Sequence, residues 1–242
     1  MELRIIAELP RWRKAGVCLR DYYYFLLTKE QKALYLTLRK YMGYQRIHHN
    51  ATVPDIHAAV KALLLDCPEL CFFEGKWGYR DNLVYPLYVL PSHSACQLTT
   101  EVKRISEQFS DRSYPRQVYD WMLAQIEYCT ASANSQNAYG ALLQRQAACK
   151  GIAKGYQLLM RERNINCILV EGTLDGQMNH VWNMILYEGC WTHVDVTMGY
   201  PCFWPLAESA DAYGGYCRTL KELSASHKVY HPEILPAETQ KR

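Results

Sequence analysis

The chain has 242 residues, 49% of them hydrophobic and 21% charged, which suffices for a sizeable core in one domain or in a domain with an extension. With 27 Lys and Arg residues against 24 Asp and Glu residues, the net charge is +3, too small to favour nucleic acid or an anionic membrane as a partner. No stretch is long and apolar enough to predict a membrane span.

The cysteine content bears on the compartment. Ten cysteines would allow five disulfides, but the opening sequence MELRIIAELPRWRK carries scattered charges and lacks the apolar core of a secretory signal. We therefore expect a cytoplasmic protein in which most cysteines are reduced and buried as small hydrophobic residues.

The first 110 residues are predicted to form a mainly helical extension. Residues 1–16 show no clear pattern, whereas Thr28 and Gln31 form a capping box that predicts a helix through about residue 44. Pro54 predicts the start of a second helix, which ends at Cys67. Two short strands are expected at 70–74 and 83–90, and Pro86 demotes the second to an edge strand or a loop. This extension carries no evident chemistry, and its surface is a candidate for binding a partner protein.

Residues 111–242 are predicted to form a second domain, which contains the candidate nucleophile. Amphipathic helices are expected at 97–110 and 113–131, the first of them still within the extension, and apolar residues recur at helical spacing from Cys149 to about residue 163. Cys149 lies in the first turn of that last helix, where unpaired N–H groups and the helix dipole favour a thiolate and an oxyanion. Gly151 and Gly155, four residues apart, indicate a groove in which another element packs against this helix.

An antiparallel meander is predicted next. Strands at 167–172, 178–187 and 190–197 are separated by the turn sequences Asp175-Gly176 and Glu188-Gly189. If the second turn is a two-residue loop, Trp182 opposes Asp195, and His180 and Asp195 lie on one face as diagonal neighbours. A loop of odd length would place them on opposite faces, so their meeting depends on this turn. The tail from residue 221 is charged and is expected to fray.

The stretches AACKGIAKGYQLL, NHVWNMI and WTHVDVTMG resemble the Cys, His and Asp boxes of the transglutaminase-like domain, in a bacterial branch of the papain-like superfamily. The resemblance covers residues 113–200 closely and extends into the N-terminal part. It implies an α+β fold in which a nucleophile-bearing helix packs on an antiparallel β-sheet. It also implies that Cys149 is the nucleophile, that His180 is the general base and acid, and that Asp195 orients His180.

Other site residues follow less directly. The resemblance places Tyr139 and Gly140 beside the active-site groove as candidate substrate contacts. Trp182 is either a core or groove-wall residue or, as the alternative, a further substrate contact. His193, on the same strand face as Asp195, is a rival partner for that carboxylate. The second oxyanion donor stays unassigned, although two glutamines, Gln144 and Gln146, precede the nucleophile.

These residues predict a cysteine-dependent hydrolase, a peptidase or deamidase, that acts on amide bonds of a protein or peptide through a thioester. The alternatives are acyl transfer from protein glutamine, which cross-links, and a non-catalytic binding module on the same fold. The pairs Cys67 with Cys71 and Cys190 with His193 do not have zinc-site spacing, and no phosphate-binding glycine loop occurs. We therefore expect neither a metal nor a cofactor.

Overall fold

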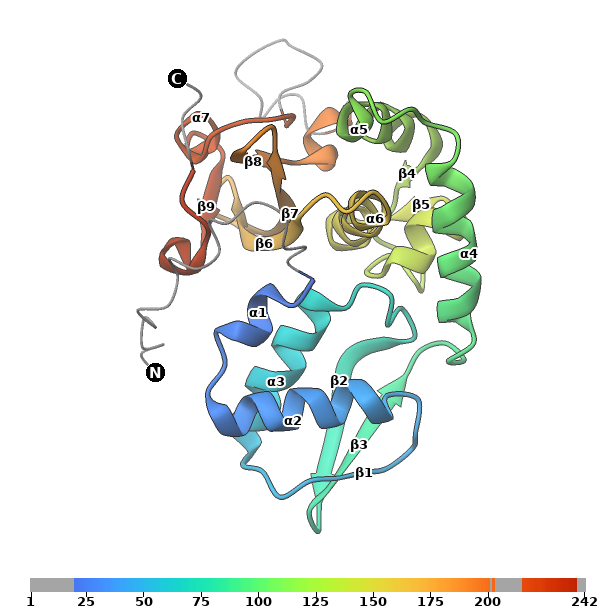
Figure 1. The fold of residues 1–242 in the computed structure, drawn as a ribbon, viewed down its shortest axis with the longest axis vertical. Helices are drawn as coiled ribbons and strands as arrows, with labels where there is room; N and C mark the ends of the chain where they lie inside the picture. The colour runs from blue at the N-terminus through green and yellow to red at the C-terminus, as the bar shows by residue number, and fades with distance from the viewer. Residues whose placement is uncertain (1–19, 201, 203–214, 239–242) are drawn as a thin grey trace.

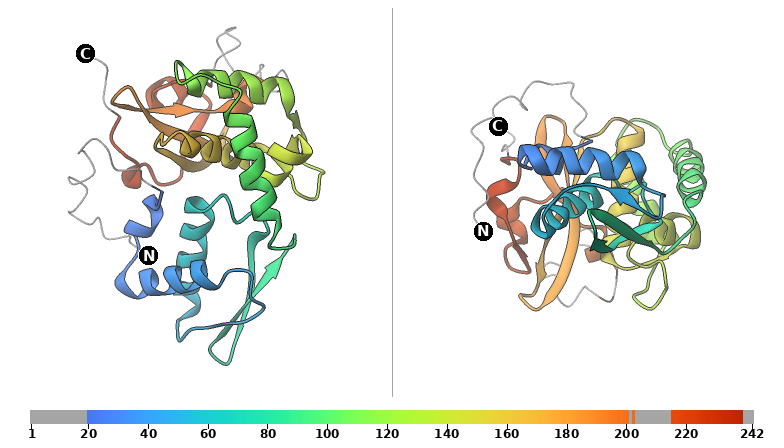
Figure 2. Two further views of the ribbon diagram at one scale, coloured as in Figure 1. Left: turned by 45° about the vertical axis from the view of Figure 1, so that its right-hand side comes forward. Right: turned by 90° about the horizontal axis from the view of Figure 1, so that it is seen from below.

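The computed structural model describes residues 20–200, 202 and 215–238, and residues 1–16 lie outside this range. Figure 1 shows a lower part, which we define as α1 to β3, and an upper part, from α5 onward, with α4 (Ser94–Ser106) running along one side from one to the other. The same arrangement is visible after a turn of 45° (Figure 2, left). Among the described residues, no helix has the length and hydropathy that crossing a membrane requires.

The lower part begins with the helices that the capping signals predict. Thr28 caps the following helix as half of a capping box, since its hydroxyl accepts from the Gln31 backbone and its own N–H group donates to the Gln31 side chain. The next helix has Thr52 as its N-cap, Pro54 in its first turn and Cys67 as its C-cap. The elements of this part are α1 (Tyr22–Phe25), α2 (Lys29–Tyr41), β1 (Ile47–His48), α3 (Val53–Asp66), β2 (Phe73–Arg80) and β3 (Leu83–Tyr88).

The strand that contains Pro86 is not an edge strand, and this prediction is wrong. The three strands of the lower part are antiparallel in the order β1-β3-β2, so β3 lies in the middle. However, β1 pairs only with Leu83 and Val84, and Pro86 faces Trp77 of β2 beyond the end of β1. A missing N–H group is tolerated there because the strand has one neighbour at that position.

The upper part contains the predicted meander, with an added strand and a nucleophile helix on the sheet. The four antiparallel strands have the order β8-β7-β6-β9, and α6 packs on β6 and β7 (Figure 1). This confirms the predicted α+β fold. The elements are α5 (Tyr114–Gln125), β4 (Glu127–Tyr128), the π-helix η2 (Gly140–Gln144), β5 (Gln146–Ala147), α6 (Cys149–Glu162), β6 (Cys167–Leu174), β7 (Met178–Tyr187), β8 (Cys190–Val194), the 3-10 helix η3 (Val196–Gly199), α7 (Leu220–Leu223), β9 (His227–Val229) and the 3-10 helix η5 (Pro232–Ile234).

The register of β7 on β8 is the predicted one, and it decides whether His180 and Asp195 can meet. Glu188 and Gly189 both have positive φ and form a two-residue loop between Tyr187 and Cys190, which pair directly. The ladder continues to the pair Asn183 and Val194 and stops there. The strand therefore ends three residues before the predicted end, because Asp195 leaves the ladder to cap η3.

The prediction that the tail from residue 221 frays is wrong for its described residues. The segment forms α7, β9 and η5, and β9 extends the sheet by pairing with β6 from Gly172 to Leu174. Val229 and His227 are buried, which provides the apolar and polar contacts that hold this short strand.

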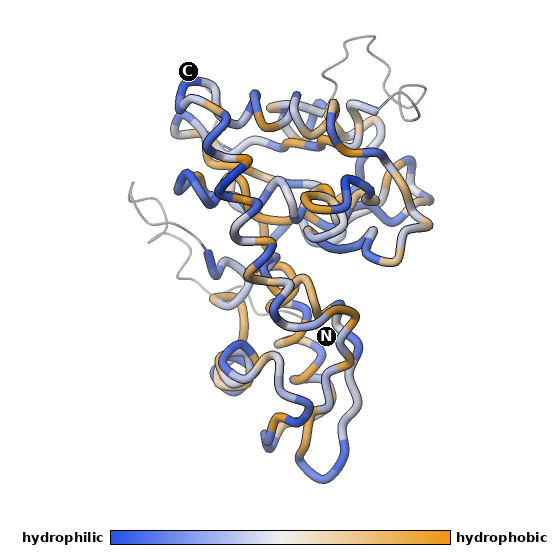
Figure 3. The backbone as a smooth tube through the Cα atoms, turned by 90° about the vertical axis from the view of Figure 1, so that its right-hand side faces the viewer, coloured by the Kyte–Doolittle hydropathy of each residue, from blue (hydrophilic) through white to orange (hydrophobic). Residues whose placement is uncertain are grey.

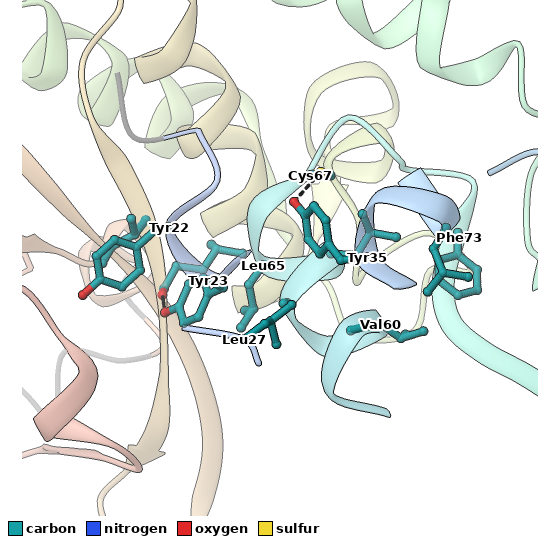
Figure 4. Packing of buried hydrophobic residues seen from close by; sticks show 14 of the residues in the cluster. Tyr22, Tyr23, Leu27, Tyr35, Val60, Leu65, Cys67 and Phe73 are labelled. Atoms are coloured by element: carbon teal, nitrogen blue, oxygen red, sulfur yellow. Dashed lines mark hydrogen bonds between the residues drawn. The ribbon is translucent and has the colours of Figure 1, made fainter. Parts of the chain in front are cut away.

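The lower part and the sheet share a hydrophobic core. Tyr35 and Leu63 of the lower helices belong to the same buried cluster as Ile168 of β6 and Trp182 of β7. Figure 4 shows the lower-part residues of this cluster, and Figure 3 shows hydrophobic segments in both parts of the chain. The Tyr23 hydroxyl adds a polar link, since it donates to the carbonyl oxygen of Leu169. The division at residue 110 that the sequence suggests stays a prediction.

The glycines of α6 allow the close approach that their spacing predicts. A Cβ atom at Gly151 would lie 2.4 Å from the carbonyl oxygen of Ser135 and 2.9 Å from that of Asn137. Gly155 is less constrained, with the side chain of Leu142 at 3.2 Å. The segment around Ser135 therefore lies directly against the first turn of the nucleophile helix.

We expect Gly151→Ala to destabilise the protein, although alanine improves helix propensity by about 1 kcal/mol. Overpacking against fixed backbone oxygens costs about 1–3 kcal/mol, and the two oxygens at 2.4 and 2.9 Å cannot rotate away. Gly78→Ala is the matched control, because the nearest atom to its added methyl group is 4.0 Å away. Urea unfolding of both variants measures the difference, and equal midpoints would contradict the packing argument.

Candidate active site

Cys149 is placed by a short parallel strand pair. Pairing of β4 with β5 sets Tyr128 beside Ala147, and the chain then enters α6 through Ala148, whose N–H group donates to the Ser135 carbonyl oxygen (2.9 Å). Ala148 offers no side-chain cap, and Cys149 is the first residue of the helix. The thiol is half-buried, and the Cys149 N–H group donates to the Tyr128 hydroxyl. Its position is the one where a helix N-terminus favours an anion.

His180 and Asp195 form a buried hydrogen-bonded pair. The His180 Nε2 atom lies 2.6 Å from the Asp195 Oδ2 atom, and each side chain is only 1% exposed. Asp195 Oδ1 accepts from the backbone N–H group of Thr197 (2.9 Å), the bond that caps η3. The carboxylate is thus held from two directions, and it fixes the imidazole with its Nε2 atom inward.

The other nitrogen of His180, Nδ1, is not engaged by Asp195. Nδ1 is buried and has no other hydrogen-bond partner among the described residues. The Cys149 side chain lies close enough to the imidazole to contribute, after Asp195, to the raised pKa of His180. The structure therefore brings Cys149, His180 and Asp195 together in the order thiol, imidazole, carboxylate.

The charges of this group favour an ion pair. Burial alone would lower the pKa of His180, but the Asp195 charge, the hydrogen bond to it and the Cys149 side chain raise the pKa above its usual range. Burial alone would raise the pKa of Asp195, but the charges and hydrogen bonds of His180 and His227 hold it well below its usual range. At neutral pH the imidazole is therefore protonated and the carboxylate is ionised.

A residue that sequence reasoning missed also contacts Asp195. His227 on β9 has its Nε2 atom 3.0 Å from Asp195 Oδ2, and its Nδ1 atom lies 2.8 Å from the Ser226 hydroxyl. The strand that carries it, 227–229, has only three residues, which is too short for a sequence pattern to predict a strand.

Trp182 covers one face of the His180 ring, and His193 holds Trp182 in place. The Trp182 ring stacks on the His180 ring with centroids 5.7 Å apart, and its Nε1–H group donates to His193 Nδ1 (2.9 Å). His193 Nε2 lies 3.1 Å from Glu238, and burial, with the charge of His227, lowers the pKa of His193 to about 4. His193 is therefore neutral and bonded elsewhere rather than to Asp195. Trp182 is 1% exposed, so the structure makes it a wall behind the imidazole rather than an open surface.

The residues before Cys149 lie near the helix start but do not point at the thiol. The Tyr139 hydroxyl donates to Gln97 of α4 (3.3 Å), and Gly140 is buried with its N–H group on the Asn137 side chain. A role in substrate contact stays a prediction for both residues. Gln144 and Gln146 are also engaged away from the thiol, with hydrogen bonds to Asn134 and Glu127 respectively.

His180, Asp195 and His227 also form the one group of potential metal ligands found among the described residues, with ligand atoms within 4.8 Å of one another. Their distances of 2.6 and 3.0 Å to the shared oxygen are those of hydrogen bonds. Ligand atoms around a tetrahedral zinc ion, bonded at 2.0 to 2.2 Å, stand roughly 3.3 Å apart. The group fits two imidazoles donating to one carboxylate better than a metal centre.

Residues 99–196 match the model of the Transglutaminase-like superfamily, which confirms the resemblance seen in the three boxes and supports a papain-like cysteine enzyme in general. No curated protein matches the chain.

Two solved structures are similar to part of the chain. One, described as a TGase, has 12% identity and a TM-score of 0.38, over 50% of this chain and 43% of that one. The other, described as a "putative cysteine protease" from Cytophaga hutchinsonii, has 25% identity and a TM-score of 0.38, over 45% of this chain and 40% of that one. The chain thus spans less than half the length of either.

Dialysis against EDTA is expected to leave the melting temperature unchanged, because hydrogen bonds rather than a metal hold His180 and His227 on Asp195. A fall in Tm that zinc restores in the wild type, but not in His227→Gln, would show that these residues bind a metal instead. Differential scanning fluorimetry with and without added zinc makes the measurement.

Asp195→Asn is expected to cost about 3–5 kcal/mol of stability, the usual cost of breaking a buried ion pair. The lowered pKa of Asp195 stabilises the fold above its unfolded value of about 3.9, and this contribution is lost as pH falls through the folded pKa. The raised pKa of His180 stabilises the fold fully below about 6.5, and this contribution is lost as pH rises through the folded pKa.

The difference between wild type and Asp195→Asn should therefore be largest from about pH 4 to pH 6.5. Urea unfolding across pH measures it. Asp175→Asn, in the exposed turn between β6 and β7, is the control and should follow the wild type. A penalty for Asp195→Asn that is the same at all pH values would contradict the ion pair.

Proposed function

We propose that this chain, whose residues 99–196 are transglutaminase-like, is a cysteine-dependent amide-bond hydrolase with Cys149, His180 and Asp195 as its catalytic triad. The observation that carries the proposal is the buried 2.6 Å bond between His180 Nε2 and Asp195, which leaves Nδ1 available to the neighbouring Cys149 thiol at a helix start. This arrangement supplies a nucleophile, a base beside it and a group that orients the base.

In the first half of the reaction, the Cys149 thiolate attacks the carbonyl carbon of the amide and a C–S bond forms. The protonated Nδ1 atom of His180 gives its proton to the amide nitrogen, the C–N bond breaks, and the amine leaves. Asp195 keeps its hydrogen bond to Nε2 throughout, so the ring does not turn. The product on the enzyme is a thioester.

In the second half, the neutral Nδ1 atom of His180 takes a proton from water, and the resulting hydroxide attacks the thioester carbon. The C–S bond breaks and the carboxylic acid leaves, so the Cys149 thiolate and the protonated His180 of the starting state are restored. An amine in place of water would give acyl transfer by the same steps, and product analysis with an added amine separates the two outcomes.

Tyr128 is the residue we propose as the second oxyanion donor. Its hydroxyl accepts from the Cys149 N–H group, and burial, followed by the charge of the Cys149 side chain, raises its pKa to about 12. The hydroxyl therefore keeps its proton at neutral pH and has one to donate. The Cys149 N–H group, now bonded to the Tyr128 hydroxyl, would have to turn to the oxyanion for both groups to donate to it, as an oxyanion requires.

The wider biological setting stays predicted rather than observed. A protein or peptide substrate, a cytoplasmic location in a bacterial cell and a partner for the lower part all derive from the sequence. We keep these as proposals that depend on the activity.

Cys149 should react with iodoacetamide at pH 6 roughly 10²-fold faster than an ordinary cysteine, which is only about 0.3% thiolate at that pH. His180→Ala should remove most of this advantage, because the imidazolium that stabilises the thiolate is lost. Peptide mass spectrometry reads each site, and the other nine cysteines of the ten serve as internal controls. Labelling of Cys149 no faster than theirs, and unchanged in His180→Ala, would overturn the triad and favour a binding module.

A further inference from the structure

The Asp195 carboxylate has two imidazoles on one oxygen. Its Oδ2 atom lies 2.6 Å from His180 Nε2 and 3.0 Å from His227 Nε2, and all three side chains are buried. The Ser226 hydroxyl, 2.8 Å from His227 Nδ1, can donate to that nitrogen and so keep the proton of His227 on Nε2, facing Asp195.

We propose that His227 is a positioning residue of the active site, which holds the Asp195 carboxylate and limits how strongly that carboxylate binds His180. The inference rests on the proposed function, since it concerns the same triad. Its hydrogen bonds go to Asp195 and Ser226, so we infer that it acts through Asp195.

The limit follows from the geometry of a carboxylate oxygen. One such oxygen has two lone-pair directions, and here both are used, one by each imidazole. Oδ1 is held separately by the Thr197 N–H group. His227 therefore provides the third hydrogen bond that holds the carboxylate. It also draws on the negative charge of Asp195, which would otherwise interact with His180 alone.

The sheet makes room for this arrangement. On β6, Gly172 faces His180 on one side and Val229 on the other, so it separates the strands that carry the two histidines. A Cβ atom at Gly172 would lie 2.8 Å from an atom of the Trp182 ring. The centroid of that ring is 5.0 Å from the centroid of the His227 ring. Glycine thus lets the three rings lie together on one face.

The surroundings of His227 contain few other charges. His180 on β7 and Asp195 after β8 face it directly, with the two imidazole rings 5.6 Å apart. His193 on β8 is the next titratable group, and it is neutral at pH 7 and bonded to Glu238 of the tail. Asp195 is therefore the main partner through which His227 can influence His180. His227 lies beyond residues 99–196, the segment that the family model matches.

The test compares His227→Leu, which has no donor, with His227→Gln, whose side-chain amide nitrogen can take the place of Nε2. The rate of iodoacetamide labelling at Cys149 is measured from pH 5 to pH 11. Its upper transition, where the His180 imidazolium loses its proton, should move up by about one pH unit in His227→Leu and stay with the wild type in His227→Gln. His231→Ala, an exposed histidine four residues away, is the control and should change nothing.

Equal shifts in both His227 variants, or none in a folded His227→Leu, would overturn the proposal. If His227→Leu does not fold, Ser226→Ala decides, because it frees the proton of His227 to move to Nδ1. A smaller shift in the same direction supports the inference, and an unchanged profile refutes it. Failure of the proposed function looks different, since Cys149 of the wild type would then be no more reactive than the other cysteines.

Discussion

The buried charge of Asp195 is the constraint on which the upper part of the molecule depends. A carboxylate that is 1% exposed is stable only if donors replace its water, and here the donors are His180, His227 and the Thr197 N–H group. They come from β7, β9 and η3, three segments that do not adjoin one another. The register of the sheet and the position of β9 therefore both bring donors to one carboxylate.

Local signals in the sequence are sufficient to predict the part of this arrangement that neighbouring segments form, which is the pairing of β7 with β8. Gly189 in a two-residue turn fixes the register of β7 on β8, so the meeting of His180 and Asp195 follows from the turn. His227 could not be found in this way. It is 32 residues from Asp195, on a strand of three residues, and its place is set by pairing with β6 rather than by a pattern of its own.

The nucleophile helix shows a second limit of pattern analysis. Its apolar stripe predicted one buried face, yet Gln157 is fully buried and Arg161 nearly so. Gln157 donates to the Leu65 carbonyl oxygen (3.1 Å), and Arg161 donates to the carbonyl oxygens of Asp66 and Arg20. These bonds pair carbonyl oxygens at the end of α3 that would otherwise lack a partner. They also hold α6 in place at the end opposite Cys149. A polar face that binds backbone groups looks the same in sequence as one that faces water.

These contacts decide how the site can work. His180 Nε2 is committed to Asp195, and the ring is covered by Trp182, so only its Nδ1 atom is left for proton transfer. The Cys149 thiol, which interacts with this imidazole, belongs to the one residue of the three that is not fully buried. Under the proposed function, a substrate would reach the imidazole over the sulfur, with the bond to be cleaved between the two. The burial of His180 and Asp195 strengthens their electrostatic interactions with groups on the open side of the site. Under the proposed function, this would let a site with few groups polarise an amide.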